Sequence, residues 1–459
     1  MKKIMIFCIP AHGHTNPILP VAKELVQRGN EVRFYSFDEF REKILATGAE
    51  YISCDRFLGT LTQQEEQNIK NVNTTEMSIQ DIRITIHMTD FLDSEYQSFQ
   101  PDVIYSDSVC FWGKLSAWKH HVPLVTSTST FAFNQLSSKY MKSTPKETAA
   151  LIFGLPKIQK EFKKLREYGY EAKNFLSLVQ NDNVTDSVVY TSKNFQPYAE
   201  SFSEHYTFVG PSVFSDKHPN KQKRPLIYIS LGTVINERPD FYLNCIEALK
   251  DQPLDVLISC GKTIDMSVFE NLPENVKVCP YVDQLDILSK ASVFITHCGM
   301  NSVSESLYMA APMVLYPQTN EQQAVARRVT EIGAGEILHD DSADGIRSAV
   351  MNILSHESYA KAAEKCCADF RSCSGAKGAA DHIEGAPHTS DGRDVLKSLN
   401  QAVISEQILY NIISIVLAAV LFRWIDRSFL WIYITAAVLL SAPIKNIFQQ
   451  AYYKKLVTQ

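Results

Sequence analysis

Residues 292–305, which read Ser-Val-Phe-Ile-Thr-His-Cys-Gly-Met-Asn-Ser-Val-Ser-Glu, constrain the fold more than any other segment. Val293–Ile295 are β-formers in an apolar run and predict a buried strand. Gly299 allows the backbone to approach a ligand closely in a tight turn. Asn301 and Ser302 can cap the helix that follows. The segment therefore predicts a strand, a turn and a helix whose N-terminus lies at the end of the strand.

The same segment arranges binding groups in a defined order. A helix N-terminus with free N–H groups is a ready site for phosphate. His297 at the end of the strand adds a donor for the same anion, and Glu305, about two helical turns further on, can accept from ribose hydroxyls. Pyrophosphate first and ribose second is the order that a nucleotide-sugar site needs.

Residues 281–323 resemble the donor-binding box of the UDP-glycosyltransferases of glycosyltransferase family 1. The box opens with Tyr-Val-Asp-Gln at 281–284, contains His-Cys-Gly-x-Asn-Ser-x-x-Glu, and continues to Pro-Gln-Thr-Asn-Glu-Gln at 317–322. The chain is similar to the bacterial macrolide-type branch, which also glycosylates flavonoids and other small phenols. The similarity covers roughly residues 1–384. It implies a GT-B fold with two facing Rossmann-like domains.

Composition is consistent with a large globular chain. A length of 459 residues favours two domains and an additional segment. The net charge of −6, with no basic stripe interleaved with aromatics, argues against a nucleic-acid partner. Ten cysteines without a CxxC pair indicate reduced thiols in a reducing compartment. The apolar residues 4–9 are too short for a secretion signal and are expected to form the first strand.

Strands alternate with helical spacing in both halves of the chain, which predicts an α/β fold with doubly wound parallel sheets. Residues 16–28 have the apolar spacing of a helix. The predicted strands are 3–8, 31–36, 102–105 and 123–126 in the first half, and 226–233, 255–259, 276–278, 293–296 and 313–316 in the second. Residues 55–100 and 130–185 are less regular and are expected to form helices and loops over an acceptor cleft.

Changes in composition mark the expected domain limits. The predicted parts are an N-terminal acceptor-binding domain at 1–210, a polar linker at 211–225, a nucleotide-sugar-binding domain at 226–384, a tether at 385–407, an apolar helical hairpin at 408–444 and a tail at 445–459. Gly, Pro, Ser and Thr in the tether predict flexibility.

The C-terminal hairpin departs from the soluble members of the family. Residues 408–422 and 428–444 contain no charged residue, and runs of about 15 and 17 residues are at the short end for transmembrane helices. A buried helical pair is the alternative. Lysines after residue 444 predict a cytoplasmic C-terminus. Since a hairpin returns to its starting side, the catalytic domains are expected to be cytoplasmic and anchored to a membrane.

His14 is the predicted general base. It lies at the C-terminal end of the first strand, where open α/β sheets bind ligands, and imidazole titrates near neutral pH. The family's catalytic histidine stands two residues before an Asn-Pro pair, and here that residue is His14. His12 is the alternative, although a role in shaping the turn is more ordinary for it. Asp107 ends another predicted strand and is expected to orient His14 and stabilise its imidazolium.

The resemblance assigns the donor contacts. His297 and Ser302 would bind the pyrophosphate, with Gly299 and Asn301 shaping the turn, and Glu305 would bind ribose. Further contacts are expected from Thr233 to the distal phosphate, Gln284 to the uridine, and Glu321 and Gln322 to sugar hydroxyls. Tyr281 stands where many relatives have a tryptophan that stacks on uracil, which puts a strict preference for uridine in doubt.

Neither a metal nor a resident cofactor is predicted, and the UDP-sugar is a co-substrate. An Asp-x-Asp motif is absent, so His297 and the helix N-terminus would stabilise the leaving diphosphate. Retaining GT-B enzymes often carry glutamate eight residues before the ribose glutamate. Histidine at that position predicts inversion, with a β-linked product.

The sequence thus predicts inverting, metal-independent transfer of a hexose from a UDP-sugar, UDP-glucose for preference, to a hydroxyl of a macrolide, flavonoid or other hydrophobic secondary metabolite. A lipid glycosyltransferase at the membrane is one alternative. A catalytically inactive nucleotide-sugar-binding scaffold is another, but its expected losses at His14, Asp107 or Glu305 are not found. A sugar-nucleotide epimerase would not need the His–Asp pair.

Overall fold

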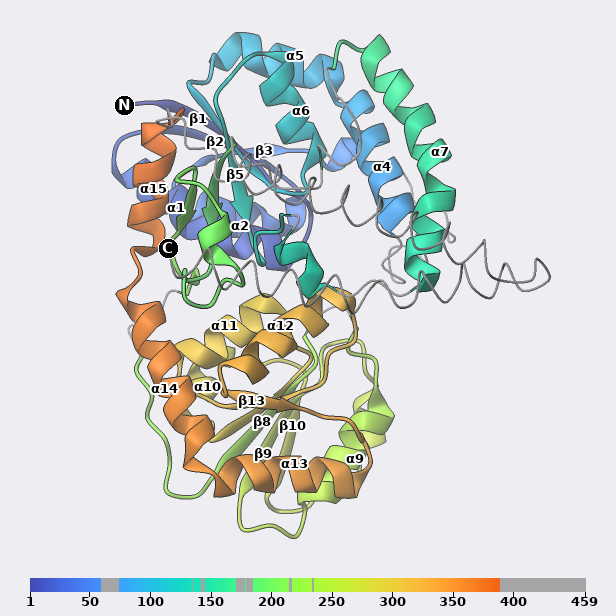
Figure 1. Cartoon of the computed structure of the whole chain (residues 1–459), viewed down its shortest axis with the longest axis vertical. Coiled ribbons are helices and arrows are strands. Elements are labelled where there is room, and N and C mark those ends of the chain that lie inside the picture. The colour runs from blue at the N-terminus through green and yellow to red at the C-terminus, as the bar shows by residue number, and fades with distance from the viewer. Residues whose placement is uncertain are drawn as a thin grey trace, which may run out of the picture. The chain divides into compact units, whose positions relative to one another are not determined.

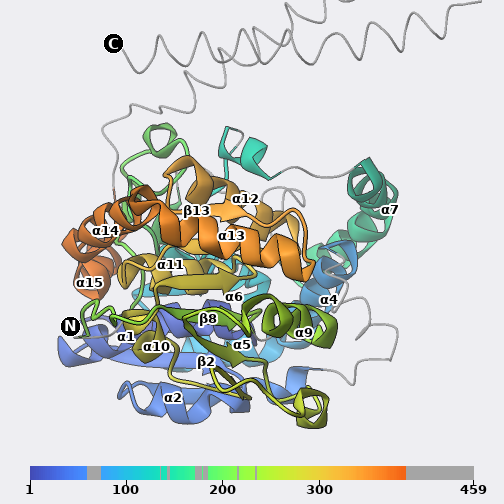
Figure 2. The same cartoon turned by 90° about the horizontal axis from the view of Figure 1, so that it is seen from below.

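The computed structural model contains two parallel sheets, each covered by helices on both faces (Figures 1 and 2). It describes residues 1–58, 74–134, 136–141, 145–170, 178, 185–213, 217–232 and 235–388. The predicted hairpin at 408–444 and Thr233 lie outside these residues. The described part contains no helix that is both long and apolar enough to cross a membrane.

The first sheet has seven strands in the order β3-β2-β1-β4-β5-β6-β7. Its strands are β1 (Lys3–Phe7), β2 (Glu31–Ser36), β3 (Glu50–Ser53), β4 (Val103–Asp107), β5 (Leu124–Thr128), β6 (Asp186–Val189) and β7 (Tyr206–Phe208). Its helices are α1 (His12–Gln27), α2 (Arg41–Leu45), α4 (Thr74–His87), α5 (Thr89–Phe99), α6 (Phe111–Lys119) and α7 (Pro145–Glu167). The chain order reverses between β1 and β4, so a crevice for ligands is expected beyond their carboxyl ends.

The second sheet has six strands in the order β10-β9-β8-β11-β12-β13. Its strands are β8 (Leu226–Ser230), β9 (Asp255–Ser259), β10 (Val276–Cys279), β11 (Val293–Thr296), β12 (Met313–Leu315) and β13 (Gly335–Ile337). Its helices are α9 (Pro239–Leu249), α10 (Gln284–Lys290), α11 (Met300–Tyr308), α12 (Asn320–Glu331), α13 (Ala343–Ser355) and α14 (Glu357–Ser372). β8 and β11 are neighbours whose connection crosses over, which gives this sheet a second switch point.

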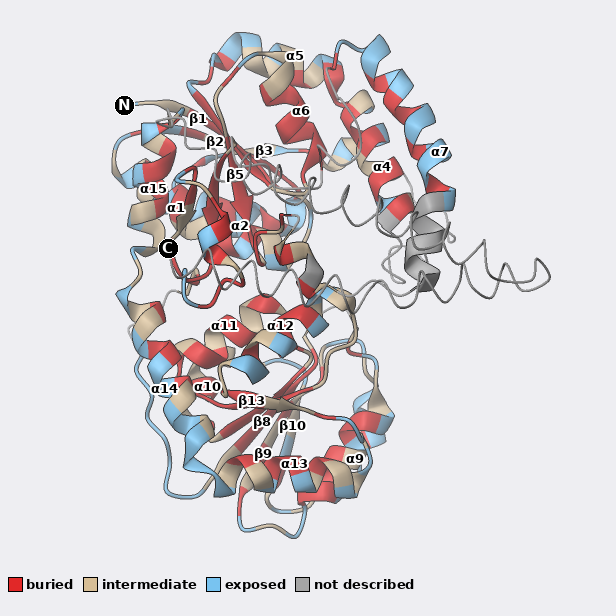
Figure 3. Cartoon of the chain, viewed as in Figure 1, coloured by how far each residue is buried: buried red, intermediate tan, exposed pale blue. Residues whose placement is uncertain are grey.

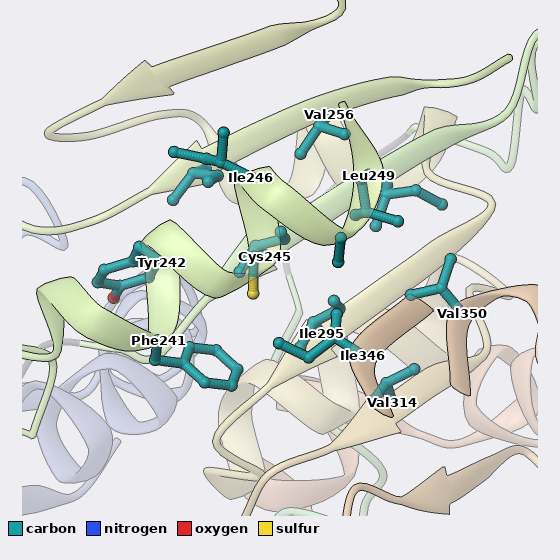
Figure 4. Close-up of a cluster of buried hydrophobic side chains, with 14 of the residues drawn as sticks. Phe241, Tyr242, Cys245, Ile246, Leu249, Val256, Ile295, Val314, Ile346 and Val350 are labelled. Atoms are coloured by element: carbon teal, nitrogen blue, oxygen red, sulfur yellow. The ribbon is translucent and has the colours of Figure 1, made fainter. Parts of the chain in front are cut away.

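Alternation along β8 shows how the second core is divided. Ile227 and Ile229 face one cluster with α9 and α13, and Tyr228 between them faces the cluster on the other side. In Figure 4 Phe241, Cys245 and Leu249 of α9 point into the first cluster. Their i, i+4, i+8 spacing forms one helical stripe. Full burial of such a side chain stabilises the fold by about 1.5–3 kcal/mol.

The predicted fold class is confirmed, because both sheets are parallel and of the Rossmann type. The predicted domain limits stay predictions. Helix α15 (Gly375–Gly385) fell within the expected second domain, yet Ala379, Ala380 and Ile383 pack in the core of the first sheet. Figure 3 shows the central strands of both sheets buried and the outer faces of α7 and α14 exposed. Within 55–100, where helices and loops were predicted, residues 74–99 form α4 and α5.

Candidate active site

His14 and Asp107 form a hydrogen-bonded pair at the switch point of the first sheet. His14 lies in the first turn of α1 after β1, and Asp107 is the last residue of β4, the neighbouring strand. His14 Nδ1 lies 2.8 Å from Asp107 Oδ2. The other carboxylate oxygen of Asp107 accepts the backbone N–H of Val109 at 3.0 Å. The acid is thereby held in place, and Nε2 of His14 is left for a substrate.

The environment of His14 raises the pKa of its imidazole. Burial lowers this pKa, but the charge and hydrogen bond of Asp107 and the charge of Glu321 together outweigh burial. Asp107 is fully buried, whereas the His14 side chain is 27% exposed. An accessible imidazole thus lies beside an inaccessible carboxylate, an arrangement that suits proton abstraction from a ligand.

Two residues near this pair were missed by sequence reasoning. Ser129, directly after β5, places its Oγ 3.1 Å from His14 Nδ1. Burial, and to a smaller extent the charge of Asp107, raises the pKa of Asp81 on α4 to about 8. The run of hydroxyl residues at 126–130, at the end of the strand next to β4, is a signal that could have indicated Ser129. Nothing in the sequence indicated Asp81.

His12, the alternative base, is engaged elsewhere. Its Nε2 lies 2.9 Å from Glu39 Oε1, and its ring meets Phe40 edge-on with centroids 4.9 Å apart. These contacts support the more ordinary role, in which His12 shapes the turn before α1.

Helix α1 begins at His12, four residues before the predicted start, and Pro17 lies within it. Proline has no N–H, so the carbonyl four residues earlier is left without its helical donor. That carbonyl belongs to Gly13, and it accepts Asn301 Nδ2 at 3.2 Å. Asn301 was expected to shape the donor turn, and it also joins α11 of the second sheet to the turn that carries His14.

Gln284, Ser302 and Glu305 meet as the predicted donor site requires. Gln284 Nε2 donates to Glu305 Oε2 at 2.6 Å and lies 3.4 Å from Ser302 Oγ. Its Oε1 accepts the hydroxyl of Tyr228 at 3.1 Å. Burial raises the pKa of Glu305, and the hydrogen bond from Gln284 partly offsets this. The start of α10 and the first turns of α11 thus form one polar cluster.

His297 follows β11 and lies between two glycines. A Cβ on Gly232 would stand 2.5 Å from its Cε1, and one on Gly299 would stand 2.6 Å from its Nε2. Gly299 therefore makes room for the imidazole, whereas the sequence had suggested close approach to a ligand. Burial lowers the pKa of His297 to about 4, so the ring is neutral. Its Nδ1 is buried without a hydrogen-bond partner in the described chain.

The expected capping of α11 was wrong. Gly299 occupies the N-cap position and no side chain caps the helix. Asn301 and Ser302 lie inside the first turn, where backbone N–H groups have no helical acceptor. This arrangement leaves the N-terminus of α11 uncapped by the protein, as an anion site requires.

The remaining predicted donor residues differ in how available they are. Tyr281 is 76% exposed, so its ring can stack on a base. Glu321 is exposed on the first turn of α12, within electrostatic range of His14. Gln322 completes a capping box for α12, and its Oε1 accepts the N–H of Gln318 at 2.7 Å. That oxygen is already bonded, which leaves the amide nitrogen for a sugar hydroxyl.

Comparison with known proteins agrees with this geometry. Residues 217–367 match the model of the UDP-glucoronosyl and UDP-glucosyl transferase family. The NDP-glycosyltransferase YjiC of Bacillus licheniformis is 35% identical over 400 residues, covering 83% of this chain and 97% of that protein. The demethyllactenocin mycarosyltransferase of Streptomyces fradiae is 29% identical, covering 84% and 86%. The crystal structure of the glycotransferase of kitacinnamycin superposes with a TM-score of 0.69 at 26% identity, covering 83% and 98%.

Proposed function

The chain belongs to the UDP-glucoronosyl and UDP-glucosyl transferase family and is a glycosyltransferase of the GT-B fold, and on this premise we propose its reaction. It transfers a hexose from a UDP-sugar, UDP-glucose for preference, to a hydroxyl of a hydrophobic small molecule, with inversion and without a metal. The observation that carries the proposal is the pair of His14 and Asp107, 2.8 Å apart at the switch point of the first sheet.

His14 is the general base of the proposed step. Its Nδ1 faces Asp107, so Nε2 takes the proton of the acceptor hydroxyl as the oxygen attacks the anomeric carbon. The buried carboxylate of Asp107 stabilises the imidazolium that forms. Glu321 lies within electrostatic range of this base and is assigned to the transferred sugar, together with the amide nitrogen of Gln322.

The leaving diphosphate is assigned to the N-terminus of α11, with Ser302 and His297. The pKa of about 4 makes His297 neutral at physiological pH, so it contributes a hydrogen bond and no full charge. The helix terminus supplies oriented N–H groups and partial positive charge. Ribose is assigned to Glu305 and the uracil to Gln284 and Tyr281. Thr233, outside the described residues, stays a predicted contact of the distal phosphate.

A donor and acceptor screen tests this proposal. The purified enzyme is given UDP-glucose or dTDP-glucose with a macrolide, a flavonoid or a simple phenol, and products are identified by mass. We expect hexosylated product with UDP-glucose, and a β-anomeric proton signal by NMR. Binding of UDP without transfer to any acceptor would contradict the transferase assignment. An α-linked product would contradict inversion.

The proposed acceptor class includes the macrolides and small phenols that the family resemblance implies. The name of the Streptomyces relative states a sugar transfer to demethyllactenocin. The apolar runs at 408–422 and 428–444 favour a second candidate, in which a lipid is the acceptor and the hairpin holds cytoplasmic catalytic domains at the membrane.

Truncation separates these two candidates. Residues 1–391 form one compact unit, so a chain ending at Asp391 keeps this unit and lacks the hairpin with the segments that flank it. We expect full-length protein to sediment with membranes and the shortened chain to stay in the supernatant and glycosylate soluble acceptors. Full-length protein found entirely in the supernatant would rule out anchoring. A shortened chain that binds UDP and transfers no sugar would make the lipid acceptor the leading candidate.

A further inference from the structure

A buried carboxylate and three imidazoles lie together at the ends of the strands of the first sheet that are opposite to the ends near His14. Asp186 is the first residue of β6, and His205 directly precedes β7. His382 lies on α15, and His388 follows this helix by three residues. Asp107 is the last residue of its strand and Asp186 the first of a parallel one, so the two groups lie at opposite ends of the strands. The proposed glycosyl transfer makes no use of this cluster.

The carboxylate of Asp186 is held from both sides. Its Oδ1 lies 2.6 Å from His205 Nδ1, and its Oδ2 accepts the backbone N–H of His388 at 3.0 Å. Asp186 is only 4% exposed. Burial of a carboxylate is costly unless a proton donor or a cation compensates it.

The other two imidazoles, those of His382 and His388, lie close to this carboxylate. His382 Nε2 lies 3.1 Å from the backbone carbonyl of His205, which places the ring proton on Nε2 and leaves a lone pair on Nδ1. That lone pair now faces the hydroxyl of Thr207 at 2.9 Å. His388 Nδ1 lies 3.2 Å from Asp186 Oδ2, and it is buried without a hydrogen-bond partner in the described chain.

We propose that Asp186, His382 and His388 bind a divalent transition metal, Zn²⁺ being the best match. Each residue offers one ligand atom, and the three atoms lie within 4.8 Å of one another. Bonds of about 2.0–2.2 Å to a tetrahedral zinc place ligand atoms roughly 3.3–3.6 Å apart, so the three groups must move closer together to bind the ion. Two imidazole nitrogens and one carboxylate oxygen form a donor set that suits zinc.

The surroundings provide what such a site needs beyond its ligands. His205 orients Asp186 and its carbonyl fixes the tautomer of His382, which are the outer contacts that ligating groups have. The His388 side chain is 32% exposed, so an ion can enter beside it and water can be the fourth ligand. The rings of His382 and His388 are stacked at 4.2 Å and 13°, so binding requires His388 to turn until both lone pairs converge.

The bound ion would be structural. It would join β6 to helix α15 and to His388, which follows this helix. Lys2 Nζ donates to the carbonyl of Ala386 at 3.0 Å and supports the same attachment. The inference is independent of the acceptor and donor proposed above.

Metal titration of the full-length protein tests this site. Protein stripped with a chelator is titrated with Zn²⁺ by calorimetry and with Co²⁺ by visible absorption, which reports tetrahedral coordination. We expect one equivalent to bind, and His388→Ala to weaken binding at least about tenfold. His218→Ala, at an exposed histidine of the linker, is the matched control and should bind as the wild type does.

Folding of the variant is checked by thermal unfolding and by UDP binding, which should match those of the wild type without metal. Zinc should then raise the midpoint of the wild type and of His218→Ala, but not that of His388→Ala. Failure of the wild type to bind zinc at millimolar concentration would overturn the proposal. Equal affinity in wild type and His388→Ala would overturn it as well, because the ion would then be bound elsewhere.

Discussion

His14 and His297 both lie beyond the carboxyl end of a strand at a switch point, His14 after β1 of the first sheet and His297 after β11 of the second, yet their environments are opposite. His14 bonds to a buried carboxylate at 2.8 Å and has a raised pKa. His297 lies between two glycines without an acidic partner, and burial lowers its pKa to about 4. One histidine is therefore suited to take a proton, and the other to donate a hydrogen bond while it stays neutral.

The difference teaches that a position at a strand end makes a residue available to a ligand, whereas the neighbouring groups set its pKa and therefore its chemical role. In the first sheet the partner comes from the neighbouring strand β4. In the second sheet no acidic side chain among the described residues pairs with His297. Gly232 and Gly299 instead bring the backbone against its ring. A carboxylate beside His297 would also repel the diphosphate proposed to bind there.

Removal of the base is expected to have the largest effect. His14→Ala should lower kcat by about 100- to 10,000-fold, the usual contribution of a positioned general base, while UDP affinity stays near normal. Steady-state kinetics and calorimetry with UDP measure the two quantities. His12→Ala is the control and should retain most activity. Comparable losses in both variants would show that the turn, and not the base, had been disturbed.

Removal of the ribose contact is expected to act on the donor alone. Glu305→Ala should raise the KM for UDP-glucose by about 10- to 150-fold, since hydrogen bonds to a charged group contribute about 1.5–3 kcal/mol. Gln284→Ala, which loses a neutral contact, should raise it less. Initial rates at varied donor and acceptor concentration separate the effects. A raised KM for the acceptor with an unchanged one for the donor would place Glu305 on the acceptor side.

Crowding of His297 tests the role of the glycines. Gly299→Ala places a methyl group 2.6 Å from His297 Nε2, so the ring must move and UDP affinity should fall about tenfold. Gly13→Ala is the steric control, because its nearest atom, Asn301 Nδ2, would be 4.0 Å away. Isothermal titration with UDP gives both values. Unchanged affinity in Gly299→Ala would remove His297 from the diphosphate site.

The smallest effect is a shift of the pH profile. A base must be neutral to act, so kcat/KM should fall as pH drops through the raised pKa of His14, above the ordinary imidazole value of about 6.5. Asp107→Asn removes the charge that raises this pKa and should move the acidic limb to lower pH. His297, with a pKa of about 4, should add no limb near neutrality. If the acidic limb of the kcat/KM profile stays at the same pH in Asp107→Asn, the limb reports a group other than His14.

Many strands and helices could be predicted from the local pattern of apolar and polar residues. The predicted strands 255–259 and 293–296 have the observed bounds of β9 and β11, because each is an apolar run with a polar border. The start of α1 was missed by four residues, since the first apolar residue with helical spacing is Ile18 and the turn that precedes it has no apolar residue to reveal it. The packing of α15 on the first core could not be predicted from the sequence, because its small buried residues, Ala379 and Ala380, would fit the core of either domain.

The sequence by itself determined the alternation of strands and helices, the choice of His14, Asp107, His297 and Glu305 as candidate site residues, and the order of the residues predicted to bind the donor. These features depend on periodicity and on neighbours within one strand–turn–helix unit. Only the tertiary structure decided that His14 Nδ1 meets Asp107, 93 residues away, and that Asn301 bonds to the carbonyl of Gly13, 288 residues away. Such pairings, and the burial that separates the pKa values of the two histidines, depend on strand order and on the contact between the two sheets' loops, which local sequence does not encode.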